Sequence, residues 1–347
     1  MLRLGIVGCG DVAHRYGRTL APHRDVPIVA VTDTDPERAK AFVDAWGGDV
    51  RSTLDELLAD TRVDCVVNLT PFEFHADVTA RALEAGKHVH TEKPVGLDTT
   101  EARALVELAG LTGLRLSCAP ITFMGHAQRA AYRTIQDGRA GEIRLVYAEV
   151  NHGRIESWHP RPEPFYAIGP LFDVGVYPLT ILAAFFGPAR RVTAWGGKLL
   201  PSRATIDGAS FEAAAPDCIV AVLELESGPV ARLTANFYVQ HEGKQHGMQF
   251  HGDRGSVLLS TWQDFDADVG FAPYDGSLES IGYDKPAGGG IDYGLALREL
   301  DAAIREGRPH APSAERAAHV VEVMCAIRDS AEQGRSVELE QPAQRLG

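Results

Sequence analysis

The chain has 347 residues, of which 45% are hydrophobic and 23% are charged, and its formal net charge is −13. This length is enough for two domains, and the composition is ordinary for a globular protein. The acidic balance and the lack of a Lys and Arg cluster argue against nucleic acid and anionic membranes as partners, because a phosphate-binding surface needs clustered positive charge.

The first predicted elements are a strand at residues 2–7, a glycine turn, and a helix at residues 12–20. The turn reads Gly8-Cys9-Gly10-Asp11-Val12-Ala13, which is Gly-x-Gly-x-x-Ala. In a dinucleotide-binding loop the first glycine makes the turn, the second lets the backbone approach a pyrophosphate, and the small sixth residue lets helix and strand pack closely. The amides that begin the helix, at Asp11 and Val12, would then face phosphates. A glycine turn alone is a weak signal, because such turns are common.

Cellular location is predicted from what the sequence lacks. A strand at the very start leaves no room for a signal peptide, and no apolar run reaches the roughly 20 residues of a membrane span. The five cysteines are scattered without a Cys-x-x-Cys pair, so we expect neither a disulfide framework nor a structural zinc site. These observations predict a cytoplasmic protein with reduced thiols.

Asp33 is the first check on the dinucleotide interpretation. An apolar, β-rich strand at residues 26–32 ends at Asp33, 25 positions after Gly8. An acid at this place hydrogen-bonds the ribose hydroxyls and repels a 2′-phosphate. No arginine follows at once, so NAD is favoured over NADP. The alternative role of capping the next helix suits Asp35 better, because Pro36 would then be the first helical residue.

Strands and helices keep alternating through residues 1–120. We predict further helices at 36–46, at 54–58 and at 99–109, and another that ends at residue 85. Further strands are predicted near residue 50 and at 63–69, 88–91 and 115–118. This alternation indicates a parallel sheet with crossover helices, that is, a doubly wound Rossmann domain. Thr70 and Pro71 leave their strand at the same carboxyl edge as Gly8, and we expect these loops to line a crevice for the dinucleotide.

Residues 86–94, Gly-Lys-His-Val-His-Thr-Glu-Lys-Pro, are typical of a helix end, a short strand and a charged turn. Pro94 cannot continue a strand ladder and biases Lys93 away from helix. Lys93 is therefore held at the carboxyl edge of a sheet, where open α/β folds bind ligands. We predict that Lys93 faces a nicotinamide cofactor and helps to move a proton. From this stretch alone, a solvated lysine in a turn is the simpler alternative.

A metal site is a competing interpretation of the same stretch. His88, His90 and Glu92 alternate, so a strand would put all three on one face, where they could ligate a metal. Two histidines on a strand without a partner cluster are more often packed or solvated side chains. We therefore expect no metal.

After residue 120 the pattern changes from alternating elements to mostly strands. A helix at 126–137 is followed by predicted strands at 143–151, 191–196, 218–226, 230–239, 248–251 and 256–260, and helices return at 293–306 and 314–333. The alternation of residues 223–226, followed by Ser-Gly-Pro, indicates an antiparallel hairpin with one polar face. We expect residues 121–347 to form a second domain, with C-terminal helices that pack back on the first.

The candidate catalytic residues of the second domain lie in residues 169–178, Gly-Pro-Leu-Phe-Asp-Val-Gly-Val-Tyr-Pro. Asp173 and Tyr177 lie four residues apart, so on a helix they would share a face, one turn apart. The alternatives are a helix N-cap for Asp173 and a core aromatic for Tyr177.

A stretch rich in proline and aromatic residues lies just upstream and should be too stiff for a helix. Trp158 and Tyr166 could stack on a sugar ring, while His159 or Arg161 binds hydroxyl groups. A packed surface loop explains this stretch equally well. His152 is a further candidate for substrate binding, although such a histidine is more often just a strand residue.

Taken together, these residues resemble the Gfo/Idh/MocA oxidoreductase family, named for glucose–fructose oxidoreductase and inositol dehydrogenase. The match rests on the glycine loop, on Asp33, and on the run Thr70-Pro71…His75…Ala85-Gly86-Lys87-His88-Val89…Glu92-Lys93-Pro94. This run is far more specific than the loop. The resemblance implies a Rossmann domain followed by an α+β domain with a large, mostly antiparallel, open-faced sheet for substrate binding and oligomerisation. Because such sheets commonly pair in the family, a homodimer or homotetramer is implied.

The resemblance also implies roles for individual residues. It puts Lys93 at the active site, often with a cis peptide before Pro94, and adds His75 and Glu92 to the cofactor-binding residues. The stretch around Asp173 looks like the family's Asp-x-Gly-x-His/Tyr motif, which would aim Asp173 and Tyr177 at the sugar hydroxyl that is oxidised.

Two departures from the family pattern bear on mechanism. Tyr177 replaces the more frequent histidine, as in the branch that resembles glucose–fructose oxidoreductase and dihydrodiol dehydrogenase. A tyrosine with a pKa of about 10 is a poor base at pH 7, so it needs a neighbouring cation such as Lys93 to favour the phenolate. The glycine run that often precedes the motif is reduced to Ala167-Ile168-Gly169, which leaves the loop shape and the substrate open.

The favoured hypothesis is an NAD(P)-dependent oxidoreductase that transfers a hydride between nicotinamide and a secondary alcohol or ketone of a sugar, polyol or sugar derivative. Tyr177 would be the acid/base, Lys93 would tune and orient it, and Asp173 would hold a substrate hydroxyl. One alternative is a glycoside hydrolase or lyase that uses tightly held NAD for transient oxidation and elimination, without net NADH. A second is a non-catalytic NAD-binding regulator, against which the joint presence of Asp33, Lys93, Asp173 and Tyr177 argues.

Overall fold

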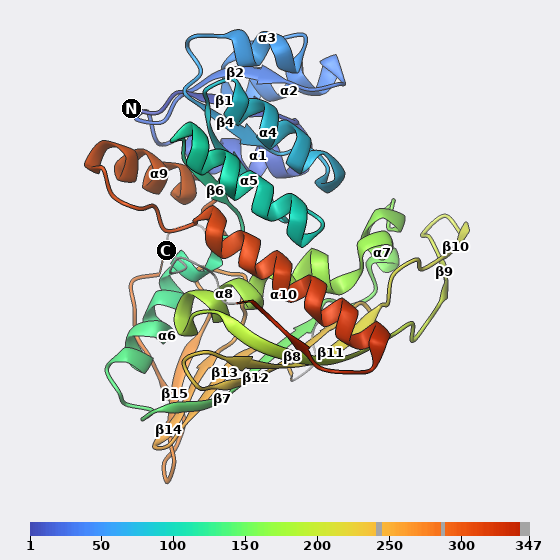
Figure 1. Ribbon diagram of the computed structural model, residues 1–347, viewed down its shortest axis with the longest axis vertical. Helices are drawn as coiled ribbons and strands as arrows, with labels where there is room; N and C mark the ends of the chain where they lie inside the picture. The colour runs from blue at the N-terminus through green and yellow to red at the C-terminus, as the bar shows by residue number, and fades with distance from the viewer. Residues whose placement is uncertain (241–244, 286–288, 341–347) are drawn as a thin grey trace. The chain divides into compact units, whose positions relative to one another are not determined.

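The computed structural model describes residues 1–240, 245–285 and 289–340. The chain divides into two compact units (Figure 1). The first unit takes Met1–Ile121 and Asp292–Val321, and the second takes Thr122–Ile291 and the chain from Glu322. Each unit has its own sheet, and the two sheets differ in the direction of their strands.

The first unit is built on a six-stranded sheet in the order β3-β2-β1-β4-β5-β6. The strands are β1 (Leu4–Val7), β2 (Ile28–Thr32), β3 (Asp49–Val50), β4 (Cys65–Asn68), β5 (His88–Thr91) and β6 (Leu116–Cys118). All neighbouring pairs are parallel. The predicted Rossmann sheet is confirmed, with the strand order reversing between β1 and β4, where such folds bind dinucleotides.

Helices connect these strands and begin at residues that the sequence marks. They are α1 (Asp11–Leu20), α2 (Pro36–Trp46), α3 (Leu54–Ala59), the short η1 (Phe72–Phe74), α4 (His75–Glu84) and α5 (Thr99–Thr112). Asp35, Thr53 and Asp98 each accept a backbone N–H from the first turn of a helix, which is the usual N-cap arrangement. Asp35 and Pro36 begin α2 as predicted, so Asp33 is left outside the helix.

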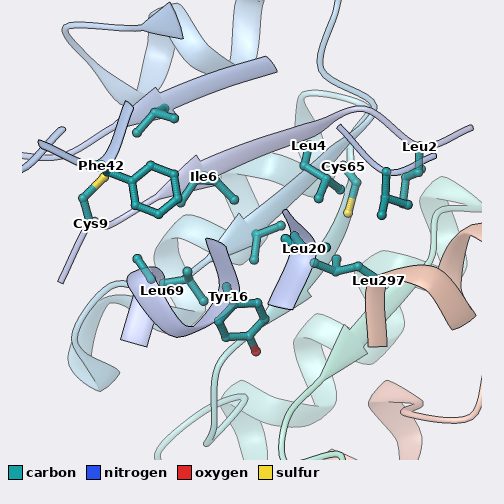
Figure 2. Packing of buried hydrophobic residues seen from close by; sticks show 14 of the residues in the cluster. Leu2, Leu4, Ile6, Cys9, Tyr16, Leu20, Phe42, Cys65, Leu69 and Leu297 are labelled. Carbon is teal, nitrogen blue, oxygen red and sulfur yellow. The ribbon is translucent and has the colours of Figure 1, made fainter. Parts of the chain in front are cut away.

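A buried apolar cluster packs β1 against α1 and against α9 (Gly294–Glu306) (Figure 2). Leu4 and Ile6 of β1, Leu20 of α1 and Leu297 of α9 all belong to it. Each such side chain stabilises the fold by about 1.5–3 kcal/mol when fully buried. This cluster therefore fixes the strand that leads directly into the glycine loop.

The second unit contains a nine-stranded sheet in the order β16-β15-β14-β13-β7-β12-β11-β8-β17. The strands are β7 (Ile143–Asn151), β8 (Ala189–Gly197), β11 (Cys218–Leu225), β12 (Val230–Asn236), β13 (Gly247–Gly252), β14 (Gly255–Leu259), β15 (Val269–Pro273), β16 (Glu279–Ser280) and β17 (Val337–Glu338). Among the described strands of this sheet, β7 and β12 pair in parallel and all other neighbours are antiparallel. The expected large, mostly antiparallel sheet is confirmed.

Several short elements of the second unit were not predicted from the sequence. The strands β16 and β17 have two residues each, and β9 (Ser202–Ala204) and β10 (Ser210–Glu212) form a separate small hairpin. Such lengths carry no periodic pattern. The unit also holds the short helices η2 (Thr122–Met124) and η3 (Ile155–Ser157) and the helix α6 (His126–Gln136), which packs on β14 and β15 (Figure 1). The last helix, α10 (Ala314–Gln333), begins in the first unit and ends in the second.

One long helical run crosses the second unit and corrects two expectations. It consists of α7 (Glu163–Pro170), the π-helical turn η4 (Leu171–Gly175) and α8 (Val176–Phe186). The end of the proline-rich stretch, from Glu163, does form a helix, because a proline in the first turn needs no N–H bond. By length and composition the run Glu163–Phe186 would also pass for a membrane span, which we did not expect, but 78% of its apolar window is buried. With Gly169 breaking it at a φ of +74°, it is a kinked core helix.

Candidate functional site

The carboxyl ends of β1, β2, β4 and β5 lie at one edge of the parallel sheet. The register pairs Val7 with both Thr32 and Asn68, and pairs Asn68 with Thr91. The glycine loop, the residue after β2, and the loops after β4 and β5 therefore leave the sheet together. The common edge that we predicted for these loops is confirmed.

The two glycines of the loop meet different requirements. Gly8 has a φ of +91°, and a side chain there would come within 2.7 Å of the Leu69 carbonyl oxygen, so the turn and the close approach both require glycine. Gly10 has no atom within 4 Å of the place where a side chain would begin, and it N-caps α1 without a side-chain hydrogen bond. The first amides of α1, those of Asp11 and Val12, therefore stand beside an open surface that an anionic group can approach.

Asp33 joins the end of β2 to the glycine loop. Its Oδ2 accepts the Cys9 N–H at 2.7 Å, and its Oδ1 accepts the Asp35 N–H at 2.7 Å. These bonds orient the carboxylate and leave each oxygen a further lone pair for another donor. The next cation along the chain, Arg38, pairs with Asp35 at 3.4 Å. The carboxylate can therefore receive hydroxyl groups from an approaching ribose.

Asn68 fixes the loop that carries Thr70 and Pro71. Its buried side-chain nitrogen donates to the His75 carbonyl oxygen at 2.9 Å and to the Thr79 hydroxyl at 3.2 Å. Its oxygen accepts the Thr70 hydroxyl at 2.7 Å and the Thr70 N–H at 3.3 Å. All four bonds are local, so a single amide at the end of β4 sets the shape of this loop.

His75 connects the loop after β4 to the loop after β5. Its Nε2 lies 2.8 Å from the Thr70 carbonyl oxygen and its Nδ1 lies 2.8 Å from the Pro94 carbonyl oxygen. Burial lowers the pKa of His75, whose side chain is only 2% exposed. The residue was predicted to bind cofactor, and the structure shows it holding together two loops that belong to the candidate cofactor edge.

The peptide between Lys93 and Pro94 is cis, as the resemblance implied. The preceding residue, Glu92, donates its N–H to the Asn68 carbonyl oxygen at 2.9 Å and accepts the Tyr16 hydroxyl on Oε1 at 2.9 Å. Its Oε2 accepts the Lys93 N–H at 3.2 Å. The turn is thus held from both β4 and α1, and Lys93 lies partly buried at the carboxyl edge.

The histidines of β5 are bonded to protein groups. His88 Nδ1 accepts the Arg115 N–H at 3.0 Å. His90 is fully buried and lies 2.9 Å from the Tyr16 hydroxyl and 2.8 Å from the Ser117 hydroxyl. Over the described parts of the chain, no group of three or more His, Cys, Asp or Glu residues is arranged to hold a metal ion.

In the second unit, the parallel strands β7 and β12 end at Asn151 and Asn236. The Asn236 amide donates to the Asn151 side-chain oxygen at 2.7 Å, and its own oxygen accepts the N–H groups of Tyr238 and Val239. The π-helical turn η4 packs against β12. Neither asparagine was predicted as a site residue, because each is a single polar residue at a strand end with no motif around it.

Asp173 and Tyr177 lie on the helical run that follows. Asp173 is buried inside η4, and the N-cap positions of η4 and α8 are Pro170 and Gly175, so the N-cap alternative for Asp173 is wrong. Single π turns are frequent at functional sites. Tyr177, in the first turn of α8, is only partly buried.

Tyr177 packs against Trp262, a residue that the sequence did not indicate. The ring of Trp262 lies 5.1 Å from the ring of Tyr177 and 5.9 Å from that of His246. The Trp262 indole N–H donates to the Glu149 carbonyl oxygen of β7 at 3.3 Å. Trp262 therefore contacts the Tyr177 ring and is itself held by β7, and no local pattern could have shown this contact, because the two residues lie in distant parts of the sequence.

The predicted substrate residues His152, Trp158 and His159 come together. The ring centroids of His152 and Trp158 are 6.1 Å apart, and those of Trp158 and His159 are 5.6 Å apart. Trp158 is 54% exposed, so one aromatic surface with two flanking imidazoles faces outward. The expected stacking role of Tyr166 is wrong, because this ring is 1% exposed and its hydroxyl donates to Glu156.

A buried ionic cluster holds this segment in place. The guanidinium of Arg203 lies 4.4 Å above the Tyr166 ring and donates to Glu156 at 2.6 Å and to Asp217. The side chains of Arg203 and Asp217 are fully buried, and burial raises the pKa of Tyr166. Asp217 also accepts the N–H of Leu199 at 2.6 Å. The segment that carries Trp158 is thus fixed to the chain around the β9–β10 hairpin.

Comparison with known proteins agrees with this architecture. The NAD-binding Rossmann-fold model of the Gfo/Idh/MocA oxidoreductase family matches residues 2–119, and the model of its C-terminal domain matches residues 128–258. Inositol 2-dehydrogenase of Rhizobium meliloti is 29% identical over 74% of this chain and 74% of its own length. dTDP-3,4-didehydro-2,6-dideoxy-alpha-D-glucose 3-reductase of Streptomyces violaceoruber is 33% identical over 55% of this chain and 56% of its own length.

A solved structure shares this fold over nearly the full length of the chain. Levoglucosan dehydrogenase, in complex with NADH and levoglucosan, superposes with a TM-score of 0.83 over 98% of this chain and 99% of that one, at 20% identity. The Rossmann sheet and the large sheet each match a domain of one family, and the family's two models follow one another along this chain as the two sheets do. The chain therefore belongs to the Gfo/Idh/MocA oxidoreductase family and is an NAD(P)-dependent dehydrogenase or reductase that acts on CH–OH groups.

Proposed function

We propose that this protein is an NAD-dependent oxidoreductase that acts on a secondary alcohol or ketone of a sugar, polyol or sugar derivative. The observation that carries the proposal is the common sheet edge, where the glycine loop, Asp33 and the turn with Lys93 leave adjacent strands. The names of the relatives support the substrate class, since inositol and a deoxysugar appear among them.

The residues at this edge fit NAD. The open face of Gly10 and the uncapped start of α1 suit a pyrophosphate. The oriented Asp33 carboxylate suits ribose hydroxyls and would face a 2′-phosphate with like charge. The nicotinamide, when bound, accepts or gives the hydride. NAD is therefore preferred to NADP.

We assign the proton of the substrate hydroxyl to Tyr177, with Lys93 as the cation that tunes it and Asp173 as the group that holds the substrate. A phenol is a poor base at neutral pH, and a nearby ammonium group favours its ionised form. This assignment requires Lys93 and Tyr177 to act on the same hydroxyl group. It draws support from the family match, which covers both residues.

The aromatic segment supports a carbohydrate or polyol as substrate. The exposed Trp158 ring offers an apolar face of the kind that packs against the C–H groups of a sugar ring. His152 and His159 flank it and can donate to or accept from hydroxyl groups.

We further propose a cytoplasmic homodimer or homotetramer that binds neither nucleic acid nor membrane. Trp195 of β8 and Val220 and Val222 of β11 are exposed large apolar side chains, and Trp195 pairs directly with Val220 across the strands. An apolar sheet face of this kind supports association with another copy. Light scattering on the purified protein measures the oligomeric state.

A panel of sugars and inositols with NAD and with NADP tests the proposal through the absorbance of the reduced cofactor. The expected result is NADH formation with at least one polyol or sugar, and a lower rate with NADP. Cleavage of a glycoside without net NADH would overturn the proposal, and so would NAD binding without any turnover across the panel.

A further inference from the structure

Three buried polar side chains and the partly buried Glu92 form a continuous hydrogen-bonded chain in the first unit. The Ser117 hydroxyl of β6 lies 2.8 Å from His90 Nδ1, and His90 Nε2 lies 2.9 Å from the Tyr16 hydroxyl. The Tyr16 hydroxyl in turn lies 2.9 Å from Glu92 Oε1. Ser117 and His90 are 0% exposed and Tyr16 is 1% exposed. Tyr16 and Ser117 belong to no sequence motif, His90 was considered only as a metal ligand, and none of the three has a role in the function proposed above.

Tyr16 is the one member of this chain that belongs to the apolar core. Its ring packs in the cluster around β1, and Figure 2 shows its oxygen pointing away from the apolar side chains. A buried tyrosine hydroxyl needs a partner, because an unpaired buried polar group destabilises a protein by about 1–3 kcal/mol. Here the hydroxyl has two partners, His90 and Glu92, so it serves as both donor and acceptor.

The chemistry of the end groups fixes the direction of every bond. An ionised carboxylate only accepts, so the Tyr16 O–H must donate to Glu92. The Tyr16 oxygen then accepts from His90 Nε2–H, and His90 Nδ1 accepts from the hydroxyl of Ser117. This order requires a neutral imidazole, and burial lowers the pKa of His90 to about 3. Burial also raises the pKa of Tyr16, so its phenol stays protonated.

The chain ends inside the protein. Ser117 is fully buried, and its backbone forms an isolated bridge with Ser313, which is also buried. A proton that moved along the chain from Glu92 would reach no solvent at Ser117. The arrangement therefore suits orientation of the carboxylate rather than proton conduction.

We propose that Tyr16 and His90 are positioning residues for Lys93 that act through the carboxylate of Glu92. Glu92 is the link, because its Oε1 accepts from Tyr16 while its Oε2 accepts the N–H of Lys93 itself. The carboxylate thus fixes the backbone of Lys93 and keeps a negative charge beside it. The proposal rests on the function proposed above, in which Lys93 assists proton transfer.

Other titratable groups surround Glu92 and bear on its ionisation. Tyr293 precedes α9, His75 lies on α4, and Cys118 ends β6, where its thiol faces the Glu92 carbonyl oxygen. Burial and the charge of Glu92 raise the pKa of both Tyr293 and Cys118. The charges of Arg15 and Lys93 act on the pKa of Tyr293 in the opposite direction to that of Glu92. Tyr16 differs from these neighbours because it donates directly to the Glu92 side chain.

The first test measures His90 by ¹⁵N NMR in the full-length protein and needs no activity. Neutral imidazole with the proton on Nε2 is expected at pH 7. A charged ring, or a proton on Nδ1, would overturn the direction of the chain and with it the proposal. Because this measurement is independent of turnover, a protein that oxidises nothing in the substrate panel would refute the proposed function while His90 still reports on the chain.

The second test compares the pH dependence of kcat for wild type, Tyr16→Phe, His90→Leu and His90→Gln. Tyr16→Phe removes only the hydroxyl, so the Glu92 carboxylate loses a donor that stabilises its charged form. We expect kcat to fall about 10- to 100-fold, the acid limb of its profile to move to higher pH, and the Kd for NAD to change less than about twofold. His90→Leu should follow the same pattern, whereas His90→Gln can donate and accept in place of the ring and should recover most of kcat.

A matched control separates this role from simple loss of stability. Tyr166 of the second unit is also buried and also donates its hydroxyl to a glutamate, Glu156. Tyr166→Phe should lower stability without moving the acid limb of kcat. An acid limb that stays in place in Tyr16→Phe and His90→Leu, or that moves equally in Tyr166→Phe, would overturn the proposal.

Discussion

The two regions that carry the candidate site residues are held in different ways. At the carboxyl edge of the first unit, Asp33, Asn68 and His75 are fixed largely by bonds to backbone groups of adjacent loops. In the second unit, the segment with Trp158 is fixed by the buried side chains of Arg203 and its two carboxylates. Backbone bonds within a parallel sheet give a rigid cofactor edge that many sequences can form. The buried ion cluster instead requires the particular side chains of Arg203, Glu156 and Asp217.

Replacement of Lys93 tests the first region at its most sensitive point. We expect Lys93→Ala to lower kcat by about a hundred- to ten-thousandfold, the usual range for an acid–base group, while the Kd for NAD stays within about twofold. Lys87→Ala is a suitable control, since Lys87 lies in the same stretch and donates to the carbonyl oxygens of Asp60 and Val63. Steady-state kinetics and cofactor titration check both variants. An active Lys93→Ala would remove the proposed role.

Replacement of Arg203 tests the second region. Arg203→Met should destabilise the protein by about 3–5 kcal/mol, because it leaves the carboxylates of Glu156 and Asp217 buried without their partner. Urea unfolding measures this loss. The exposed pair of Arg144 and Asp253 provides the control, since its removal should change stability by at most about 1 kcal/mol. Equal effects at the two sites would contradict the contrast between the regions.

Replacement of Asp33 tests how the first region selects its cofactor. Asp33→Ser should raise the Kd for NAD about 10- to 100-fold, since a hydrogen bond to a charged group contributes about 1.5–3 kcal/mol. The Kd for NADP should rise less or fall, because the like charge opposite a 2′-phosphate is gone. Fluorescence titration with both cofactors measures the ratio. If the preference for NAD over NADP were unchanged in this variant, Asp33 would not be the residue that binds the ribose and discriminates between the two cofactors.

The buried His90 predicts how stability depends on pH. Its pKa is about 3 in the folded protein and about 6.5 when unfolded. The unfolded chain therefore binds the proton more tightly, so this contribution is complete above pH 6.5 and is lost as the pH falls towards 3. At about 1.4 kcal/mol per pH unit, wild type should lose about 2 kcal/mol more than His90→Gln between pH 6.5 and 5. Parallel pH curves of unfolding free energy for the two proteins would contradict this.

Trp158 should show the smallest effect. Trp158→Ala removes an exposed aromatic face from the second region, and an aromatic contact of this kind contributes about 0.5–1.5 kcal/mol. We expect KM for the substrate to rise about two- to tenfold, with kcat and the Kd for NAD nearly unchanged. The measurement uses whichever sugar or polyol the panel identifies.

The difference between the regions also explains what could be predicted from the sequence. The glycine loop, the N-caps and the strand lengths of the first unit depend on neighbours within a few positions, and their patterns predicted the sheet and its common edge. The partners of Arg203 lie 47 and 14 positions away, and the chain from Tyr16 to His90 spans 74 positions. A burial pattern shows that such residues face inward but does not show which one they meet. This is why Trp262, Asn236 and Tyr16 were missed, and why Tyr166 was wrongly given an exposed role.

The geometry of His75 has one more consequence. Both ring nitrogens face carbonyl oxygens, of Thr70 on one side and Pro94 on the other, but an uncharged imidazole carries a single N–H. At any instant one of the two loops therefore goes without its hydrogen bond, and a change of tautomer exchanges which loop that is. The position of one hydrogen atom therefore couples the loop after β4 to the loop after β5. A ligand that hydrogen-bonds to one of these two carbonyl oxygens would favour the His75 tautomer that donates to the other.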